Sequence, residues 1–170
     1  MKEFFGLESE YHVLLDGVKL PEIIKIIGAD GTEKVIDEEC VREAFCHAIQ
    51  IAADYKYTNN DFNDVVTLLE SGKNAVVVVV GGDGENRAER SVKELVERVE
   101  STGCSKEQIC SWLLHIQFVS AEFKPTGKEY CFIRNAFIQR ITNECDIMMG
   151  FSDGVDGKDD FWRITTIAVY

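Results

Sequence analysis

Two carboxylates three residues apart are the first candidates for chemistry in this sequence. Asp61 and Asp64 belong to the stretch NNDFNDVV, residues 59–66, which opens a short apolar run with helical spacing. Paired acidic side chains can orient a water molecule for attack on a phosphate. The same residues can instead cap a helix, because a carboxylate near its first turn gains about 0.3 to 1 kcal/mol from the helix dipole. Capping alone would explain both acids.

A glycine-rich turn is the second candidate. The sequence GGDGEN, residues 81–86, separates a valine-rich run from an amphipathic one, and such a strand-to-helix turn can aim backbone N–H groups at a phosphate. Asp83 and Glu85 place two negative charges in the turn, and no Lys, Ser or Thr follows at P-loop spacing. We therefore predict that the glycines serve a tight turn.

Other chemistry-bearing residues do not combine into a site. Cys46 and His47 are adjacent on an expected helix, where consecutive side chains point about 100° apart and cannot form a hydrogen-bonded dyad. Residues 152–160, SDGVDGKDD, lack the spacing of a calcium loop. His12 and His115 have no second ligand at metal spacing. We predict no metal site and no cofactor.

The composition narrows the class of protein. The chain has 170 residues, enough for one domain of ordinary size, and a formal net charge of −12, which repels nucleic acid and anionic membranes. No apolar stretch approaches the roughly 18 residues of a membrane span. Six cysteines without a C-x-x-C pair fit buried free thiols in a reducing compartment. We expect a cytoplasmic protein with no nucleic acid and no membrane partner.

Hydrophobic periodicity predicts an alternation of strands and helices. The expected order is strands at 11–16 and 22–27, a long helix at 37–55, a short helix from Phe62 to Leu69, a covered strand at 75–80, a helix at 85–99, a strand at 112–119, a helix at 128–143, and a closing hairpin of 145–151 with 161–170.

This order predicts the fold class. We expect an α+β (α/β mixed) fold with an about four-stranded mixed sheet and helices packed on it. A long helix and an N-terminal strand pair precede that sheet. The corresponding parts are an N-terminal β extension (1–36), a long connecting helix (37–57) and one compact unit (58–170).

Two motifs in this order resemble a known family. NNDFNDVVTLL, a valine-rich strand, GENRAERSVKEL, WLLHIQF and a closing RITTIAVY resemble the C-terminal domain of FtsZ, the cell-division GTPase related to tubulin, over residues 38–170. The matching residues of the first motif are Asn59, Asp61, Phe62, Asp64 and Val65, and those of the second are Gly84, Glu85, Asn86, Arg87 and Ala88. The family's nucleotide-binding signature GGGTGTG does not occur in this chain.

The resemblance implies a role for the acidic loop. In the family this loop reaches the nucleotide pocket of the next filament subunit, where its acids orient the attacking water. Carried over by position, those roles fall on Asp61 and Asp64, with Asn59 as a polar positioning residue. The chain is then no enzyme by itself and supplies these residues only in trans. A bacterial source and a function in cell division follow from the same resemblance.

Three hypotheses stay open at this point. The first is a non-enzymatic FtsZ-like interaction domain that binds or modulates an FtsZ- or tubulin-like polymer through the acidic loop. The second is a self-associating or small-ligand-binding domain that reuses the fold and keeps the loop as a helix cap. The third is a fragment of a larger protein, against which residues 1–36 count because they do not resemble the end of a GTPase domain.

Overall fold

The computed structural model describes residues 23–27, 33–36, 62–105, 107–139 and 145–170. The predicted strand at 11–16 and the predicted long helix at 37–55 lie outside these residues, and the division of the chain at residues 36 and 57 stays a prediction.

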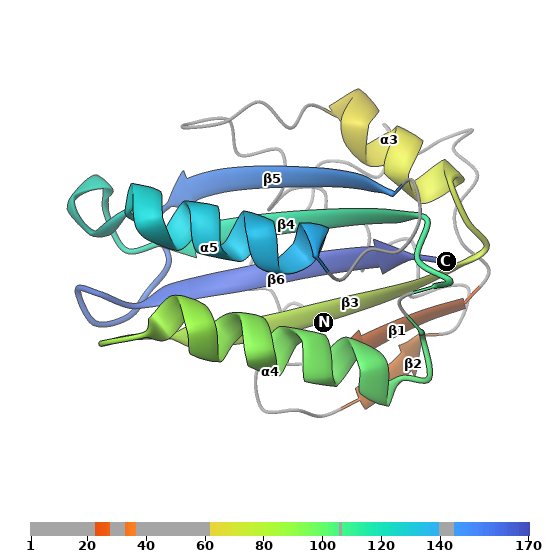
Figure 1. Ribbon diagram of the computed structural model, residues 1–170, viewed down its shortest axis with the longest axis horizontal. Coiled ribbons are helices and arrows are strands. Elements are labelled where there is room, and N and C mark those ends of the chain that lie inside the picture. The colour runs from red at the N-terminus through yellow and green to blue at the C-terminus, as the bar shows by residue number, and fades with distance from the viewer. Residues whose placement is uncertain (1–22, 28–32, 37–61, 106, 140–144) are drawn as a thin grey trace.

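The described strands form one six-stranded mixed sheet in the order β2-β1-β3-β6-β4-β5 (Figure 1). Along the chain the strands are β1 (Ile23–Ile27), β2 (Glu33–Ile36), β3 (Asn74–Gly82), β4 (Ser111–Phe118), β5 (Asp146–Asp153) and β6 (Trp162–Val169). β3, β6, β4 and β5 make up the predicted four-stranded mixed sheet, so the expected fold class is confirmed.

The predicted closing hairpin is wrong. β6 pairs antiparallel with both β3 and β4, while β5 pairs parallel with the far side of β4, so β4 separates the two strands. Burial explains the arrangement. β6 is buried along nearly its whole length and therefore belongs in the centre, whereas the first half of β5 is half-exposed and suits the edge. Adjacency in sequence alone favoured the hairpin.

The N-terminal strand pair continues the same sheet. β1 confirms the predicted strand at 22–27, and it pairs parallel with β3. Its antiparallel partner β2 occupies residues 33–36 and was not predicted.

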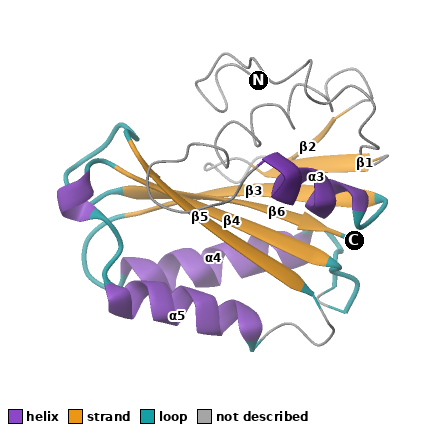
Figure 2. Ribbon diagram, turned by 90° about the horizontal axis from the view of Figure 1, so that it is seen from above, coloured by secondary structure: helices purple, strands orange, loops and turns teal. Residues whose placement is uncertain are grey.

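Helices cover both faces of the sheet (Figure 2). α4 (Arg87–Ser101) and α5 (Gly127–Ile138) lie on one face, and α3 (Phe62–Glu70) lies on the other. A short 3-10 helix, η2 (Ala121–Phe123), precedes α5. α4 forms where predicted because Val92, Leu95 and Val99 recur at helical spacing and are buried.

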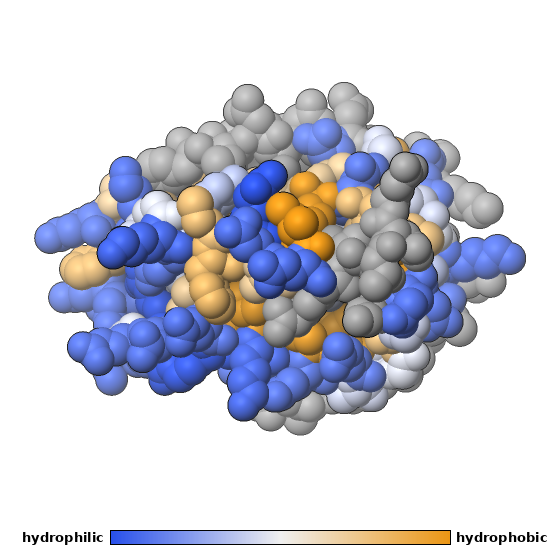
Figure 3. Space-filling view, in the orientation of Figure 1, coloured by the Kyte–Doolittle hydropathy of each residue, from blue (hydrophilic) through white to orange (hydrophobic). Residues whose placement is uncertain are grey.

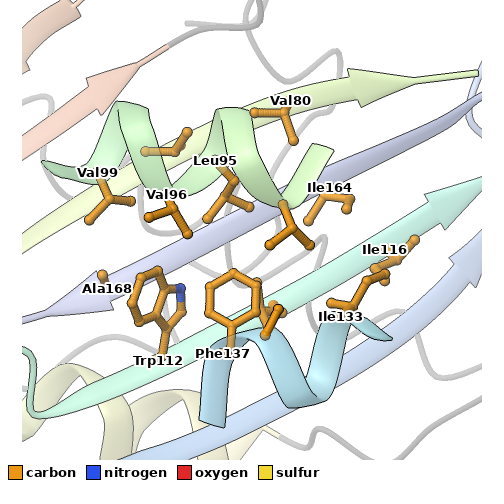
Figure 4. Packing of buried hydrophobic residues seen from close by; sticks show 14 of the residues in the cluster. Val80, Leu95, Val96, Val99, Trp112, Ile116, Ile133, Phe137, Ile164 and Ala168 are labelled. Carbon is orange, nitrogen blue, oxygen red and sulfur yellow. The ribbon is translucent and has the colours of Figure 1, made fainter. Parts of the chain in front are cut away.

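The main core lies between the sheet and the helices α4 and α5 (Figure 4). Trp112 of β4 packs edge-on against Phe137 of α5 with ring centroids 4.7 Å apart. Residues 75–80 of β3 are all buried, which confirms the strand covered on both faces. None of the described helices combines the length and apolar character that crossing a membrane requires.

Candidate functional site

Asp64 is the one member of the predicted acidic loop within the described residues; Asn59 and Asp61 lie outside them. It is half-buried in the first turn of α3, as the capping hypothesis expects. Leu68 and Leu69 are fully buried and hold the C-terminal half of α3 in place on the sheet. Asp64 therefore lies on a helix whose position is fixed by buried side chains. Its role in orienting an attacking water molecule stays a prediction.

The second motif, Gly84 to Arg87, forms the turn between β3 and α4. Gly84 has φ +67° and Asn86, the residue before the helix, has φ +58°, in the left-handed region that glycine and asparagine tolerate best. The Gly84 N–H donates to Oδ2 of Asp160 at 2.7 Å. The Gly84 N–H is thus already bonded to a carboxylate of the chain itself, which agrees with the tight-turn interpretation. Glu85 is exposed.

Arg87 is a buried connector. Its Nε donates to Oε1 of Glu129 at 2.7 Å, and its Nη1 donates to the Asp160 carbonyl. The guanidinium also lies over the Trp162 ring, 4.2 Å from the ring centroid. Only 7% of Arg87 is exposed. The residue joins the starts of α4 and α5 to the loop before β6 and is not available to a substrate.

Sequence reasoning missed the partners of Arg87. Thr126 and Glu129 form a capping box at the start of α5, in which Thr126 Oγ1 accepts from the Glu129 N–H and Glu129 accepts from the Thr126 N–H. The pattern T-x-x-E was the available signal. Nothing in the sequence pattern pointed to Asp160 or Trp162, because both reach Arg87 only through the tertiary fold.

The two predicted motifs lie in different places. α3 covers one face of the sheet and leads into the N-terminal end of β3, whereas the turn lies at the C-terminal end of β3 and leads onto the opposite face (Figures 1 and 2). Asp64 and the residues Gly84 to Arg87 therefore do not form one site.

A polar cluster lies where side chains of β4, β5 and β6 alternate away from the α4–α5 core. His115 Nε2 and Ser152 Oγ are 2.9 Å apart, and Gln117 accepts two hydrogen bonds from Arg163. Burial, with a smaller effect of Arg163, lowers the pKa of His115 to about 3. His115 is therefore neutral.

The Ser152–His115 pair has the distance of a nucleophile and its base, but not the surroundings. Both residues are at most 1% exposed, so no substrate carbonyl can approach the hydroxyl. Among the described residues His115 Nδ1 has no hydrogen-bond partner, so none of them orients the imidazole as a third group. We interpret the pair as structural. Within the described ranges, no group of three or more His, Cys, Asp or Glu side chains could hold a metal ion.

The described cysteines only partly match the expectation of buried thiols. All four are free, and Cys104 is buried as expected. Cys110 and Cys131 are exposed and Cys145 is half-buried, so the expectation is wrong for these three residues. Cys131 lies on the exposed side of α5.

Comparison with known proteins places the fold. The chain is similar to a structure titled FtsZ dimer, empty, from M. jannaschii (TM-score 0.62, 17% identity, 78% of this chain and 37% of that one). It is also similar to the FtsZ W319Y mutant of M. jannaschii (0.59, 16%, 78% and 40%) and to TubZ of Bacillus thuringiensis serovar israelensis in GDP-form protofilaments (0.54, 16%, 77% and 37%).

These similarities confirm the predicted resemblance at the level of the fold. The chain has an FtsZ- and tubulin-like fold and spans about two fifths of the length of these structures, as a partial FtsZ-like domain does. No protein-family model matches the sequence, and no curated protein matches it either.

Proposed function

We propose that this chain is a non-enzymatic interaction domain that binds an FtsZ- or tubulin-like polymer and modulates it. The observation that carries the proposal is the likeness of the chain to part of FtsZ and of TubZ, the latter solved as protofilaments. By itself the domain neither binds nor hydrolyses GTP, since the family's nucleotide-binding signature does not occur in the sequence. Its proposed location is the cytoplasm.

The acidic loop is the proposed contact. Asp64 stands at the start of a helix fixed by the buried side chains of Leu68 and Leu69, which is the rigid support that a contact residue needs. Asn59 and Asp61 precede it by a few residues. A partner that supplies a nucleotide would receive the two carboxylates near the attacking water, so the domain would complete a GTPase site in trans.

The experiment adds the purified chain to a polymerising FtsZ-like protein of the same organism and follows light scattering and phosphate release. The expected result is a change in both signals that grows with the amount of chain added. Asp61→Asn and Asp64→Asn should each reduce the change at least about tenfold, because a positioned carboxylate acts mainly through its charge.

Glu89→Gln is the matched control. Glu89 is also an acidic residue in the first turn of a helix, so its replacement costs a similar helix-dipole term, but it lies on α4, which covers the other face of the sheet. This variant should act like the unmodified chain. If neither signal changes at an excess of chain, the proposal fails for that polymer. Stable self-association that hides Asp61 and Asp64 would instead support a self-associating domain.

A further inference from the structure

Cys110 and Cys145 directly precede two neighbouring strands, β4 and β5. These strands are parallel, and the first residue of β4, Ser111, is the register partner of the first residue of β5, Asp146. Both strands begin at the same end of the sheet (Figure 1). Continued by one residue toward the N-terminus of each strand, this register places Cys110 beside Cys145.

The two thiols share one face of the sheet. Side chains alternate between the two faces of a strand, so Cys110 lies on the face of Trp112, which belongs to the main core. Cys145 packs against the same core, together with Ile147. Apolar side chains remain visible at the centre of this face, among hydrophilic ones (Figure 3). Both sulfur atoms therefore lie on the side of the sheet that α4 and α5 cover.

The spacing of the two residues suits a disulfide. Neighbouring strands lie about 4.7 to 4.9 Å apart, and disulfides join residues whose Cα atoms are about 4.4 to 6.8 Å apart. Burial raises the pKa of Cys145 most, followed by the charge of Asp146, and the charge of Cys110 raises it further. Such an influence of one thiolate on another weakens with distance, which agrees with two sulfur atoms lying close together.

Neither described thiol makes a strong hydrogen bond. Cys110 Sγ lies 3.5 Å from the carbonyl oxygen of Gln108. Cys145 Sγ lies 3.6 Å from the carbonyl oxygen of Asp146. Because a thiol is a weak donor, both side chains can turn toward each other at little cost. Cys110 is exposed and Cys145 is half-buried, so an oxidant in solution meets Cys110 first.

We propose that Cys110 and Cys145 form a reversible disulfide that ties the edge strand β5 to β4. The oxidant is a low-molecular-weight disulfide, such as oxidised glutathione. The Cys110 thiolate attacks one sulfur of the oxidant, and the S–S bond of the oxidant breaks to release one reduced glutathione. The Cys145 thiolate then attacks the Cys110 sulfur and releases the second one. The two protein thiols lose two electrons and two protons, and the oxidant gains both.

This bond restrains the strand at one edge of the described sheet. Among the described strands β5 pairs with β4 alone, and its residues 146–149 are exposed or half-exposed. Closing the loop of residues 110–145 also removes conformational freedom from the unfolded chain. In a reducing compartment an exposed disulfide is short-lived, so the bond reports the presence of an oxidant and is not a permanent cross-link.

The experiment treats the purified chain with oxidised glutathione, blocks the remaining thiols with iodoacetamide and analyses an unreduced tryptic digest by mass spectrometry. Trypsin places each of the six cysteines on a different peptide, because Lys or Arg separates every pair. The expected product joins the peptides of Cys110 and Cys145, and an excess of reduced glutathione separates them again. A lasting mixed disulfide at Cys110 with Cys145 still free, or a linkage between two copies of the chain, would overturn the proposal.

Cys131→Ser is the matched control, because Cys131 is also an exposed thiol but lies on α5. The disulfide should form in this variant and should not form in Cys110→Ser or Cys145→Ser. Oxidation should raise the melting temperature of the unmodified chain and of Cys131→Ser by roughly 5 to 10 °C and leave that of Cys110→Ser unchanged.

Hydrogen exchange tests the effect on the edge strand. The amides of residues 146–149 should exchange severalfold more slowly in the oxidised chain than in the reduced chain, and equally fast in Cys110→Ser under both conditions. An equal rise in the melting temperature of Cys110→Ser contradicts the proposal. So does exchange at β5 that oxidation leaves unchanged, since the bond would then not restrain this strand.

Discussion

Arg87 Nε donates to Glu129 Oε1 at 2.7 Å and thereby ties the first residue of α4 to the capping box of α5. Arg87→Ala should destabilise the fold by about 3 kcal/mol or more, because it leaves a partly buried carboxylate without its partner and removes the cation over the Trp162 ring. Urea unfolding followed by circular dichroism measures the loss. Lys93→Ala breaks an exposed pair with Glu97 on α4 and should cost about 0.5 kcal/mol or less, so equal costs would contradict the role given to Arg87.

Because of Glu129, part of this stability depends on pH. Burial by itself raises the pKa of Glu129, but the hydrogen bonds from Arg87 and Thr126 outweigh it and hold that pKa below its ordinary value of 4.5. The contribution of Glu129 is therefore present above pH 4.5 and is lost as the pH falls through the lower pKa of the folded state. Glu129→Gln should flatten this part of the stability profile, measured by urea unfolding between pH 6 and 3. An unchanged profile would contradict the pairing.

His115 should make the stability of the fold depend on pH over a wider range than Glu129 does. Its pKa falls from 6.5 to about 3 on folding because burial disfavours the charged form. Stability is then complete above pH 6.5 and decreases as the pH falls toward 3, by roughly 1.4 kcal/mol for each pH unit, since only the unfolded state takes up the proton. NMR should show a neutral His115 ring at pH 5. A ring that titrates near pH 6.5 would show that the residue is accessible to water.

Gly82 should tolerate no side chain. A Cβ at this position would lie 2.4 Å from Ser91 Oγ and 2.6 Å from Trp162 Nε1, and those two atoms hydrogen-bond to each other at 3.0 Å. We expect Gly82→Ala to destabilise the protein by about 1 to 3 kcal/mol, as overpacking and the disturbed hydrogen bond add together. Thermal denaturation measures the loss, and in that measurement Gly127→Ala, which places a methyl group in open space, should be neutral or slightly stabilising.

The described thiols should react at different rates. Burial, followed by the charges of Asp146 and Cys110, raises the pKa of Cys145 to about 11, so it holds little thiolate at pH 8. Cys110 and Cys131 are exposed. Iodoacetamide at pH 8 should modify these two first and Cys145 more slowly, as followed by peptide mass spectrometry. Fast modification of Cys145 would contradict its half-buried position.

Local patterns in the sequence determined the elements themselves. The stripe of Val92, Leu95 and Val99 predicted α4, and the valines of residues 76–80 predicted a strand covered on both faces, because side-chain periodicity reflects which faces are buried. The motifs around Asp64 and Gly84 were enough to indicate an FtsZ-like fold, which the structural similarities confirm.

Only the tertiary structure decided how the elements combine. It placed β6 between β3 and β4 and so excluded the expected hairpin, because a strand that is buried along nearly its whole length needs a neighbouring strand on each side. It also brought Arg87, known from the sequence only as a motif residue, into contact with Glu129 and Asp160, which are 42 and 73 residues away along the chain. Contacts at such separations leave no periodic signal in a single sequence, since they depend on the packing of elements whose order in space the chain alone does not reveal.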